Sequence, residues 1–400
     1  MTTISIDKCR LSGVSSAPTS KSVTHRRLIA SALSKKRCVI SDILYSDDIN
    51  VTLNALEKLN CKIIRNKSSV IVDGQDFLKE VKGVIDCKQS GSSLRFLIPI
   101  ALLMDKEVTF TGSNRLLERG LEDYQDLCNE YNFLFERKDD TIKVKGKLTV
   151  GEYYLKGNSS SQYSTGMILA LASLRGKSQI HISESLQSRS YIRLTCSIVN
   201  EYGIDCKMND NDIIINSNGY KAIDSVIEAD LSNAAYLDCF NYIGSSVKIT
   251  NLSEDSIQPD KVYKELFEKI KEKTPTIDIA ECVDLAPILI SLSAVNNGAT
   301  LLNTKRLAIK ESDRAKAMQE ELKKFNVEII VEENRIIIPK SKLSKPKEVL
   351  DSHNDHRIAM ALIPLLTLTG GKINNIEAIN KSFPNYLEKL EKLGLIYSID

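Results

Sequence analysis

The sequence predicts an α/β protein of two lobes, each built from three repeats of one strand–helix–strand–helix–hairpin unit. Three observations lead to this fold class. Six segments share an extended apolar stretch, a polar elbow of small or charged residues, and then an apolar helix. Amphipathic helices alternate with these segments. Several units close with alternating apolar residues around a polar turn, which is typical of a β-hairpin.

The predicted elements recur at regular spacing. The apolar helices begin near residues 21, 91, 161, 231, 284 and 355, which gives spacings of 70, 70, 70, 53 and 71 residues. The amphipathic helices begin near 48, 120, 191, 260, 312 and 384, and hairpins are predicted at 61–74, 133–146, 204–217 and 327–340. Six units divide into two lobes of three, with the seam near residues 218–228. A cleft between two similar lobes is a usual place for a ligand site.

Composition indicates an ordinary soluble globular protein of two domains. The 400 residues are 42% hydrophobic and 26% charged, and 54 Lys and Arg balance 52 Asp and Glu. This balance disfavours a nucleic-acid-binding protein. Nine scattered cysteines without a CxxC pair predict reduced thiols and no zinc framework. The chain shows no signal peptide and no apolar run of the roughly 18 residues that a membrane span needs, so we expect a cytoplasmic protein.

The polar elbows are candidate anion sites. A helix N-terminus leaves backbone N–H groups unpaired and favours negative charge. At any single elbow, an N-cap or a solvated lysine is the commoner reading, but the repetition favours a small substrate with several negative charges. The elbows hold Ser20, Lys21, Ser22 and Arg26, then Gly91, Ser92, Ser93 and Arg95, then Ser159, Ser160, Ser161 and Gln162, and finally His356 and Arg357. The amphipathic series adds Arg119, Ser188, Lys310, Arg314 and Lys381.

Two carboxylates among these cations are candidates for proton transfer. Asp284 stands in VDLAP, and Glu311 stands in KESDR. The alternative for Glu311 is a plain ion pair with Arg314 on a helix surface.

The stretch DSHNDHRIAMAL, residues 351–362, raises a separate question, because His353, Asp355 and His356 resemble metal ligands. The repeat places His356 at a helix start, as it places Arg95. We therefore predict anion binding there and no metal site.

Taken in order, the motifs of this chain resemble those of the 5-enolpyruvylshikimate-3-phosphate (EPSP) synthase family over essentially its whole length. The matching segments are SKSVTHR (20–26), SDD (46–48), SGSSLRF (90–96), LLERG (116–120), SSSQY (159–163), SRSYI (188–192), EADLSNAAY (228–236), VDLAP (283–287), KESDRAKAMQEELKK (310–324), NDHRIAM (354–360) and KSFP (381–384).

The resemblance implies an inside-out α/β barrel fold, the enolpyruvyl transferase fold, with the active site in the interdomain cleft. It implies a C-terminal lobe of residues 1–19 plus 228–400, with the N-terminal strand crossing over, and an N-terminal lobe of residues 20–227. The implied reaction transfers the enolpyruvyl group of phosphoenolpyruvate to the 5-hydroxyl of shikimate 3-phosphate and releases phosphate. It proceeds through a tetrahedral intermediate, needs no metal or organic cofactor, and belongs to aromatic amino-acid (chorismate) biosynthesis. We expect a monomer.

The resemblance also implies residue roles. The catalytic residues would be Asp284, Glu311 and Lys21. Shikimate 3-phosphate would bind to Lys21, Ser22, Arg26, Ser160, Ser161, Gln162, Ser188, Tyr191, Asp284 and Lys310. Phosphoenolpyruvate would bind to Lys21, Gly91, Arg119, Gln162, Arg314, Arg357 and Lys381. Because Gly91 leaves space beside the phosphoenolpyruvate site, we expect sensitivity to glyphosate.

The chain departs from the family pattern at a few positions. Many members have Gly at position 19, where this chain has Thr19, and some have Asn at position 89, where it has Gln89. Arg306 stands where some members carry an Asn that touches the shikimate phosphate, and Asn326 stands where a helix-ending Gly is common. Asn tolerates the left-handed conformation that such a position needs.

The sequence disfavours three other functions. Enolpyruvyl transfer to UDP-N-acetylglucosamine uses the same fold, but the loop near 112–120 lacks the cysteine expected for it. A non-catalytic anion-binding scaffold would be expected to have lost some of Lys21, Asp284, Glu311 and Lys381, and all four are present. An RNA-end enzyme on related repeats is disfavoured by the charge balance.

Overall fold

The computed structural model describes residues 2–156, 160–183 and 188–400. Its backbone contacts divide the chain into two compact units. We call Thr19–Glu228 the N-terminal lobe, and Met1–Pro18 with Ala229–Asp400 the C-terminal lobe. The lobe boundaries expected from the sequence, after residues 19 and 227, each differ from these divisions by one residue.

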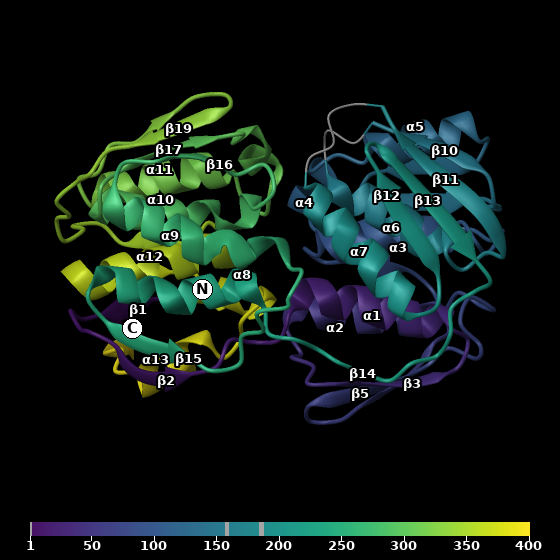
Figure 1. Ribbon diagram of the computed structural model, residues 1–400, viewed down its shortest axis with the longest axis horizontal. Coiled ribbons are helices and arrows are strands. Elements are labelled where there is room, and N and C mark those ends of the chain that lie inside the picture. Colours follow the sequence, from purple (N-terminus) through teal and green to yellow (C-terminus); the bar gives the residue numbers. More distant parts are fainter. Residues whose placement is uncertain (1, 157–159, 184–187) are drawn as a thin grey trace. The chain divides into compact units, whose positions relative to one another are not determined.

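The N-terminal lobe contains three successive repeats of the expected unit (Figure 1). The first comprises α1 (Lys21–Leu33), β3 (Arg37–Ser41), α2 (Asp47–Lys58), β4 (Lys62–Arg65) and β5 (Ser69–Asp73). The second comprises β6 (Ile85–Asp86), α3 (Gly91–Ala101), β7 (Val108–Thr111), α4 (Asn114–Glu118), α5 (Glu122–Glu130), β8 (Leu134–Lys138) and β9 (Thr141–Lys145). The third comprises β10 (Glu152–Leu155), α6 (Ser161–Leu171), β11 (Gly176–Ile182), α7 (Arg189–Glu201), β12 (Asp205–Asn209) and β13 (Asp212–Ser217), and β14 (Ser225–Val226) ends the lobe.

Each repeat of this lobe builds a four-stranded sheet with the same pairing pattern. The strand orders are β14-β3-β5-β4, β6-β7-β9-β8 and β10-β11-β13-β12. In every sheet the first pair is parallel and the other two pairs are antiparallel. The hairpins expected at 61–74, 133–146 and 204–217 are therefore confirmed as β4–β5, β8–β9 and β12–β13.

The C-terminal lobe begins with β1 (Ile4–Ile6) and β2 (Ser12–Ser15) and resumes after the N-terminal lobe. The fourth repeat comprises α8 (Leu231–Asp238), the 3₁₀ turn η1 (Cys239–Ile243), β15 (Ser246–Ile249), η2 (Pro259–Val262) and α9 (Tyr263–Glu272). The fifth comprises β16 (Thr276–Asp278), η3 (Val283–Leu285), α10 (Ala286–Val295), β17 (Ala299–Leu302), η4 (Lys305–Ile309), α11 (Arg314–Lys324), β18 (Ile330–Val331) and β19 (Arg335–Ile338). The sixth comprises β20 (Leu350–Asp351), α12 (His356–Thr369), β21 (Gly371–Asn374), η5 (Ile376–Lys381), α13 (Tyr386–Lys392) and β22 (Tyr397–Ile399).

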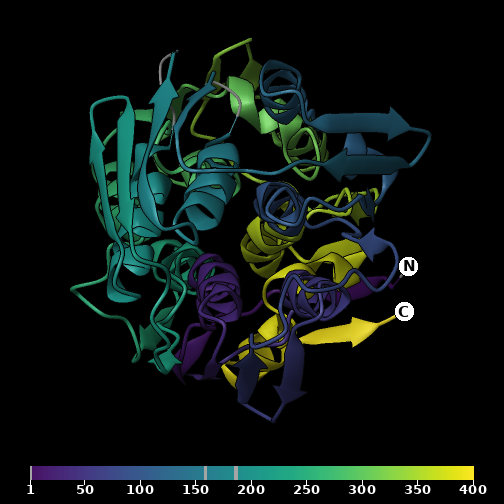
Figure 2. The same cartoon turned by 90° about the vertical axis from the view of Figure 1, so that its right-hand side faces the viewer.

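The sheets of the C-terminal lobe vary this pattern. The fifth repeat keeps it, in the order β16-β17-β19-β18, whereas in the fourth repeat β15 pairs in parallel with β2 in a two-stranded sheet. Because α9 leads directly to β16 without a hairpin, the spacing between these two repeats is 53 residues and not about 70. In the sixth sheet, β1 lies antiparallel between β21 and β22. Both chain ends therefore lie side by side in Figure 2.

The first helices of five repeats begin at equivalent capping residues. Ser20, Ser90, Ser160, Asp230 and Asp355 each accept a hydrogen bond from a backbone N–H in the first turn of their helix. These side chains satisfy donors that a helix start leaves unpaired. The first four caps stand 70 residues apart, which explains the regular spacing of the elbows in the sequence.

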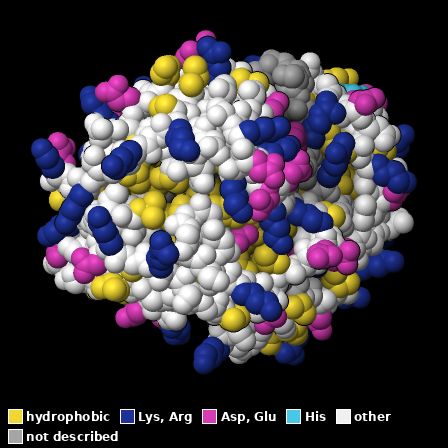
Figure 3. Space-filling view, turned by 60° about the vertical axis from the view of Figure 1, so that its left-hand side comes forward, with side chains coloured by type: hydrophobic (Ala, Val, Ile, Leu, Met, Phe, Trp, Pro, Cys, Tyr) yellow, Lys and Arg dark blue, Asp and Glu magenta, His cyan; other side chains and the backbone are white. Residues whose placement is uncertain are grey.

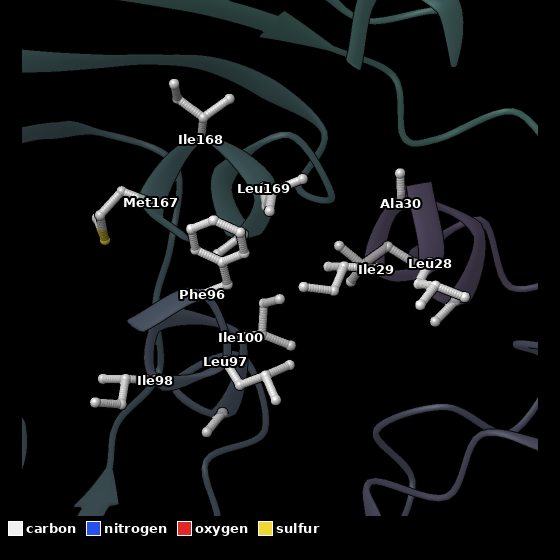
Figure 4. Packing of buried hydrophobic residues seen from close by; sticks show 14 of the residues in the cluster. Leu28, Ile29, Ala30, Phe96, Leu97, Ile98, Ile100, Met167, Ile168 and Leu169 are labelled. Atoms are coloured by element: carbon white, nitrogen blue, oxygen red, sulfur yellow. The ribbon is translucent and has the colours of Figure 1, made fainter. Parts of the chain in front are cut away.

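Each lobe has its own hydrophobic core, formed mainly by these apolar helices. In the N-terminal lobe, α1, α3 and α6 direct apolar side chains toward one another (Figure 4). Ile29, Phe96, Leu97 and Ile168 are at most 1% exposed.

Surface charge is mixed. On the face shown in Figure 3, Lys and Arg side chains are interspersed with Asp and Glu, in keeping with the nearly equal totals. Among the described residues, none of the helices combines the length and apolar character required to cross a bilayer.

Candidate active site

Lys21, the first residue of α1, forms an ion pair with the start of α2. Its Nζ lies 2.7 Å from Oδ2 of Asp48, and the two side chains are only 16% and 13% exposed. An anionic ligand that binds Lys21 would have to compete with this carboxylate. Asp48 was not predicted as a site residue, although the SDD motif at 46–48 was a signal for it.

Arg26 is buried and holds three helices together. Its Nε donates to Oγ1 of Thr195 at 2.8 Å, one terminal nitrogen donates to the carbonyl of Ser22 at 2.7 Å, and the other lies 3.3 Å from Oγ1 of Thr165 and 3.4 Å from the carbonyl of Tyr191. Burial lowers the pKa of Arg26 to about 10. The guanidinium thus links α1 with α6 and α7, and its assignment to the substrate remains a prediction.

Gly91 lies beside two arginines at the start of α3. A Cβ at this position would lie 2.9 Å from one terminal nitrogen of Arg95 and 3.0 Å from one of Arg119, so a side chain would displace them. Arg95 donates to the carbonyl of Arg119 at 2.9 Å and to Oε1 of Gln162 at 3.2 Å, and Gln162 donates to Oγ of Ser92 at 3.1 Å. The structure therefore brings together three predicted phosphoenolpyruvate residues, with Arg95 as their organiser.

The predicted hydroxyl residues lie at helix starts of the same lobe. Ser160 caps α6, and Ser161 is its first residue. Ser188 precedes α7 in the left-handed conformation, with φ of 55°, and is 1% exposed. The Tyr191 carbonyl accepts from Thr195 and Arg26, which ties this turn to α1, where Ser22 is half-buried. Ser159, which precedes Ser160 in the elbow before α6, lies outside the described residues.

A buried chain of hydroxyl groups connects α1, α2 and α3 beneath these elbows. Nδ1 of His25 lies 2.7 Å from Oγ1 of Thr52, which lies 2.7 Å from Oγ of Ser93, and that oxygen lies 2.8 Å from Oγ of the cap Ser90. Burial, with the charges of Lys21 and Arg26, holds the pKa of His25 well below its usual range. The imidazole is therefore neutral and hydrogen-bonds to Thr52.

In the C-terminal lobe, Asp284 is surrounded by three cations. Its Oδ1 accepts from Nζ of Lys310 at 3.2 Å and from Arg314 at 2.8 Å, and its Oδ2 lies 3.4 Å from Arg357. Burial alone would raise the pKa of Asp284, but these cations hold it well below its ordinary value. Asp284 is a carboxylate that becomes a stronger base whenever its cations are drawn away.

Arg314 organises the carboxylates of this lobe. It is 1% exposed and donates to Asp284, to Oε2 of Glu311 at 2.8 Å, and to both oxygens of Asp355. The alternative reading of Glu311 as an ion-pair partner of Arg314 is thus observed, but the arginine is buried and not on a surface. Asp355 was not predicted as a site residue, and its NDHR motif was the available signal.

Arg357 and Lys381 are the other buried cations here. The guanidinium carbon of Arg357 lies 5.9 Å from the centroid of the Tyr236 ring, and its Nη1 has no hydrogen-bond partner among the described residues. Lys381 donates to the carbonyl of Asn354 and is 7% exposed. A buried donor left without a partner is costly, so Arg357 is suited to receive an anionic ligand.

Two ionisable groups that interact with Asp284 have shifted pKa values. Burial lowers the pKa of Lys310 to about 8, and the positive charge of Arg306 and Arg314 acts in the same direction. Asp260, in η2, is 1% exposed, and burial together with the charge of Asp284 raises its pKa to about 6. The charge of Arg306 therefore helps to lower the pKa of Lys310. Asp260 was not predicted as a site residue. The available signal was its place in QPD (258–260), where the proline indicates the start of a helical turn.

The histidine-rich stretch at 351–362 does not assemble ligands. Asp355 is occupied by Arg314, and Nε2 of His353 lies 2.9 Å from Oε1 of Glu321. His356 is buried at the first position of α12. Within residues 2–156, 160–183 and 188–400, no group of three or more His, Cys, Asp or Glu side chains is arranged to hold a metal ion.

The fold is that of the enolpyruvyl transferases. An EPSP synthase from Acinetobacter baumannii superposes with a TM-score of 0.80 at 21% identity and full coverage of both chains. The enolpyruvyl transferase NikO from Streptomyces tendae superposes with a TM-score of 0.79 at 13% identity, over 100% of this chain and 98% of that one. At these identities the likeness establishes the fold.

Comparison of sequences identifies the family more specifically than comparison of structures does. Residues 7–390 match the EPSP synthase (3-phosphoshikimate 1-carboxyvinyltransferase) family. The 3-phosphoshikimate 1-carboxyvinyltransferases of Clostridium novyi and Clostridium kluyveri are 37% and 35% identical, and the alignments cover 98% of this chain and 98% and 97% of theirs. The chain belongs to the EPSP synthase family. It is a 3-phosphoshikimate 1-carboxyvinyltransferase of the shikimate pathway, which serves aromatic amino-acid biosynthesis.

Proposed function

We propose that the cation groups of both lobes act on one pair of substrates, phosphoenolpyruvate and shikimate 3-phosphate. In the N-terminal lobe, Gly91, Arg119 and Gln162 would bind phosphoenolpyruvate. The α1, α6 and α7 starts would bind shikimate 3-phosphate through Ser22, Arg26, Ser160, Ser161, Gln162, Ser188 and Tyr191. The support is local: most of these residues are N-caps or first-turn residues of α1, α3, α6 and α7, where backbone N–H groups favour anions. Arg26 lies one turn further along α1, and Arg119 is the C-cap of α4.

In the C-terminal lobe, Arg314, Arg357 and Lys381 would complete the phosphoenolpyruvate site. Lys310 would contact shikimate 3-phosphate beside Asp284. The Nη1 donor of Arg357, which has no partner within the described part of the chain, supports this assignment, since a carboxylate or phosphate oxygen would give the buried guanidinium its missing partner.

The single observation that carries the mechanism is the carboxylate of Asp284 held by Lys310, Arg314 and Arg357. Anionic substrates compete for these cations. As the cations turn toward the substrates, their hold on Asp284 weakens, so its affinity for a proton rises. Substrate binding would thus convert a weakly basic carboxylate into the base that takes the proton of the 5-hydroxyl.

The remaining steps follow from the same groups. The deprotonated 5-oxygen bonds to C2 of phosphoenolpyruvate while Glu311, protonated once Arg314 turns from it to the substrate, delivers its proton to the methylene carbon, which gives the tetrahedral intermediate. The C2–O bond to phosphate then breaks, phosphate leaves, and the Glu311 carboxylate takes back one methyl proton, which forms the enolpyruvyl product. Lys21, at the start of α1, completes the catalytic set as a cation that stabilises the departing phosphate.

The test is phosphate release by the purified chain with phosphoenolpyruvate and shikimate 3-phosphate, in EDTA. Asp284→Asn should lower kcat at least about a hundredfold, in the range that loss of a general base costs. Asp313→Asn is the matched control, because Asp313 caps α11 and Asn caps equally well. Release only with UDP-N-acetylglucosamine, or with neither acceptor, would contradict the proposal and favour the sister activity or a non-catalytic scaffold.

We also propose a cytoplasmic monomer. Nine cysteines without a disulfide support a reducing compartment. Light scattering of the purified chain tests the oligomeric state.

A further inference from the structure

The loop that joins β20 to α12 has two successive residues in the left-handed conformation and is supported by hydrogen bonds to a buried glutamate. His353 and Asn354 both adopt the left-handed conformation, with φ of 50° and 52°. Two such residues in succession are costly without support from their surroundings. The support comes from Glu321 in α11, which is 1% exposed. Its carboxylate lies 2.9 Å from Nε2 of His353 and accepts from the backbone N–H of Asp351 at 3.0 Å.

This loop sets the positions of the candidate phosphoenolpyruvate cations. The carbonyl of the left-handed Asn354 accepts from Lys381. The next residue, Asp355, binds Nε of Arg314 at 2.8 Å and caps α12 through the backbone N–H of Arg357 at 2.9 Å. A shift of the loop would therefore move three cations together.

We propose that the His353–Glu321 pair is a proton-dependent positioning device, which fixes the loop and so tunes the affinity of the C-terminal lobe for phosphoenolpyruvate. The inference rests on the proposed function, because it takes Arg314, Arg357 and Lys381 as phosphoenolpyruvate ligands. It assigns a role to His353, the first histidine of the DSHNDHR stretch, which neither anion binding nor metal binding explains.

The electrostatic surroundings favour a charged histidine. The hydrogen bond with Glu321 raises the pKa of His353, against the effect of burial, and the charges of Glu321, Asp351 and Glu320 add to it. Among the described residues, α11 presents Glu320, Glu321 and Lys324 to this region, and β20 presents Asp351.

The contribution of the His353–Glu321 pair to loop stability should decrease as the pH rises. Because the pKa of His353 is higher in the folded chain, the stabilisation is complete below its ordinary value of 6.5. It is lost as the pH rises through the raised value. Above that pH, a neutral imidazole keeps only an uncharged hydrogen bond to Glu321, which is weaker.

The test compares His353→Gln with the unmodified chain from pH 6 to 9. His353 is 26% exposed, so glutamine should be accommodated, and it cannot titrate. We expect the KM for phosphoenolpyruvate to rise roughly three- to tenfold at pH 6, as loss of a charge-assisted hydrogen bond allows. We expect kcat and the KM for shikimate 3-phosphate to change less than about twofold. The KM ratio should fall toward one by pH 9.

His181→Gln is the matched control. His181 also pairs with a carboxylate, Oδ1 of Asp212 at 2.9 Å, and is also 26% exposed, but it lies in β11 of the N-terminal lobe. Its kinetic constants should match those of the unmodified chain. A KM ratio for His353→Gln that stays at one, or that stays raised at every pH, would overturn the proposal.

A measurement without turnover separates this inference from the proposed function. An NMR titration of the four imidazoles, assigned by the two glutamine variants, should give His353 a pKa above 6.5. A value at or below 6.5 would overturn the proposal whatever the activity. Absence of phosphate release from the unmodified chain would instead refute the proposed function and leave the titration readable.

Discussion

Arg314 binds Asp355 through two nitrogens, with Nε 2.8 Å from Oδ2 and a terminal nitrogen 3.3 Å from Oδ1, and both side chains are at most 1% exposed. The pair joins the start of α11 to the cap of α12. A two-point contact between planar groups fixes direction as well as distance. It therefore aligns the two helix starts that carry the buried cations of the C-terminal lobe.

Asp355→Asn should destabilise the chain strongly. It removes the charge that faces Arg314 and leaves the buried guanidinium with weaker compensation, which costs about 3 kcal/mol. The free energy of unfolding from urea titration measures this loss. Glu332→Gln, which breaks the exposed pair with Arg335, should leave the urea midpoint unchanged. Equal effects of the two substitutions would contradict the assigned role of Asp355.

Lys310 should set the alkaline limit of activity. Its pKa is about 8 because it is buried near other cations, so kcat/KM should fall as the pH rises past 8 and the ammonium loses its proton. Lys310→Arg keeps the positive charge and should move this limit upward by at least about one pH unit, since arginine stays protonated. Lys316→Arg, on the exposed face of α11, is the control and should not move it. An unchanged limit in Lys310→Arg would assign the titration to another group.

Gly91→Ala should weaken phosphoenolpyruvate binding and glyphosate inhibition while the fold persists. The added Cβ would meet the terminal nitrogens of Arg95 and Arg119, and these flexible side chains can move away. Displaced cations should raise the KM for phosphoenolpyruvate about tenfold, which corresponds to about 1.4 kcal/mol. Glyphosate inhibition curves should shift to higher concentrations. At Gly151 an added Cβ would make only an ordinary contact with the Tyr153 ring, 4.0 Å away, so Gly151→Ala should change neither property. Normal turnover of the unmodified chain at glyphosate levels far above those of phosphoenolpyruvate would contradict the expected sensitivity.

The repeat was predictable because its signals are local. Capping residues at 20, 90, 160 and 230 and the alternation of the hairpins depend on a few neighbouring residues, so they can be read directly. Asn326 likewise adopts a positive φ of 65° after α11, as expected for a residue in place of a helix-ending glycine. The short helix α4 was not foreseen, because its five residues are too few to show periodicity.

The candidate site was predictable as a set of residues, but its pairings were not. The sequence indicated which side chains stand at helix starts. It gave no means of pairing Arg314 with Asp355, which is 41 residues away, or Arg26 with Thr195, which is 169 residues away. These contacts depend on how helices of different repeats pack. The same holds for His353, whose partner Glu321 lies on another helix.

Thr52→Val should reveal the contribution of the buried hydroxyl chain. Valine has nearly the same shape but leaves Nδ1 of His25 and one hydroxyl contact of Ser93 unsatisfied, at a cost of about 2 kcal/mol in the free energy of unfolding. Thr24→Val is the control in the neighbouring helix. Its hydroxyl donates to the carbonyl of Ser20, which also accepts from the Thr24 backbone N–H, so its loss should cost under about 1 kcal/mol.

A double-mutant cycle with Ser93→Ala distinguishes the chain from simple burial. If Thr52 and Ser93 act through their mutual hydrogen bond of 2.7 Å, the two losses should be non-additive by about 1 kcal/mol. Additive losses would mean that each hydroxyl acts through its other contacts. The start of α3 would then be held in place by apolar packing around Phe96, and Thr52→Val should leave the KM for phosphoenolpyruvate unchanged.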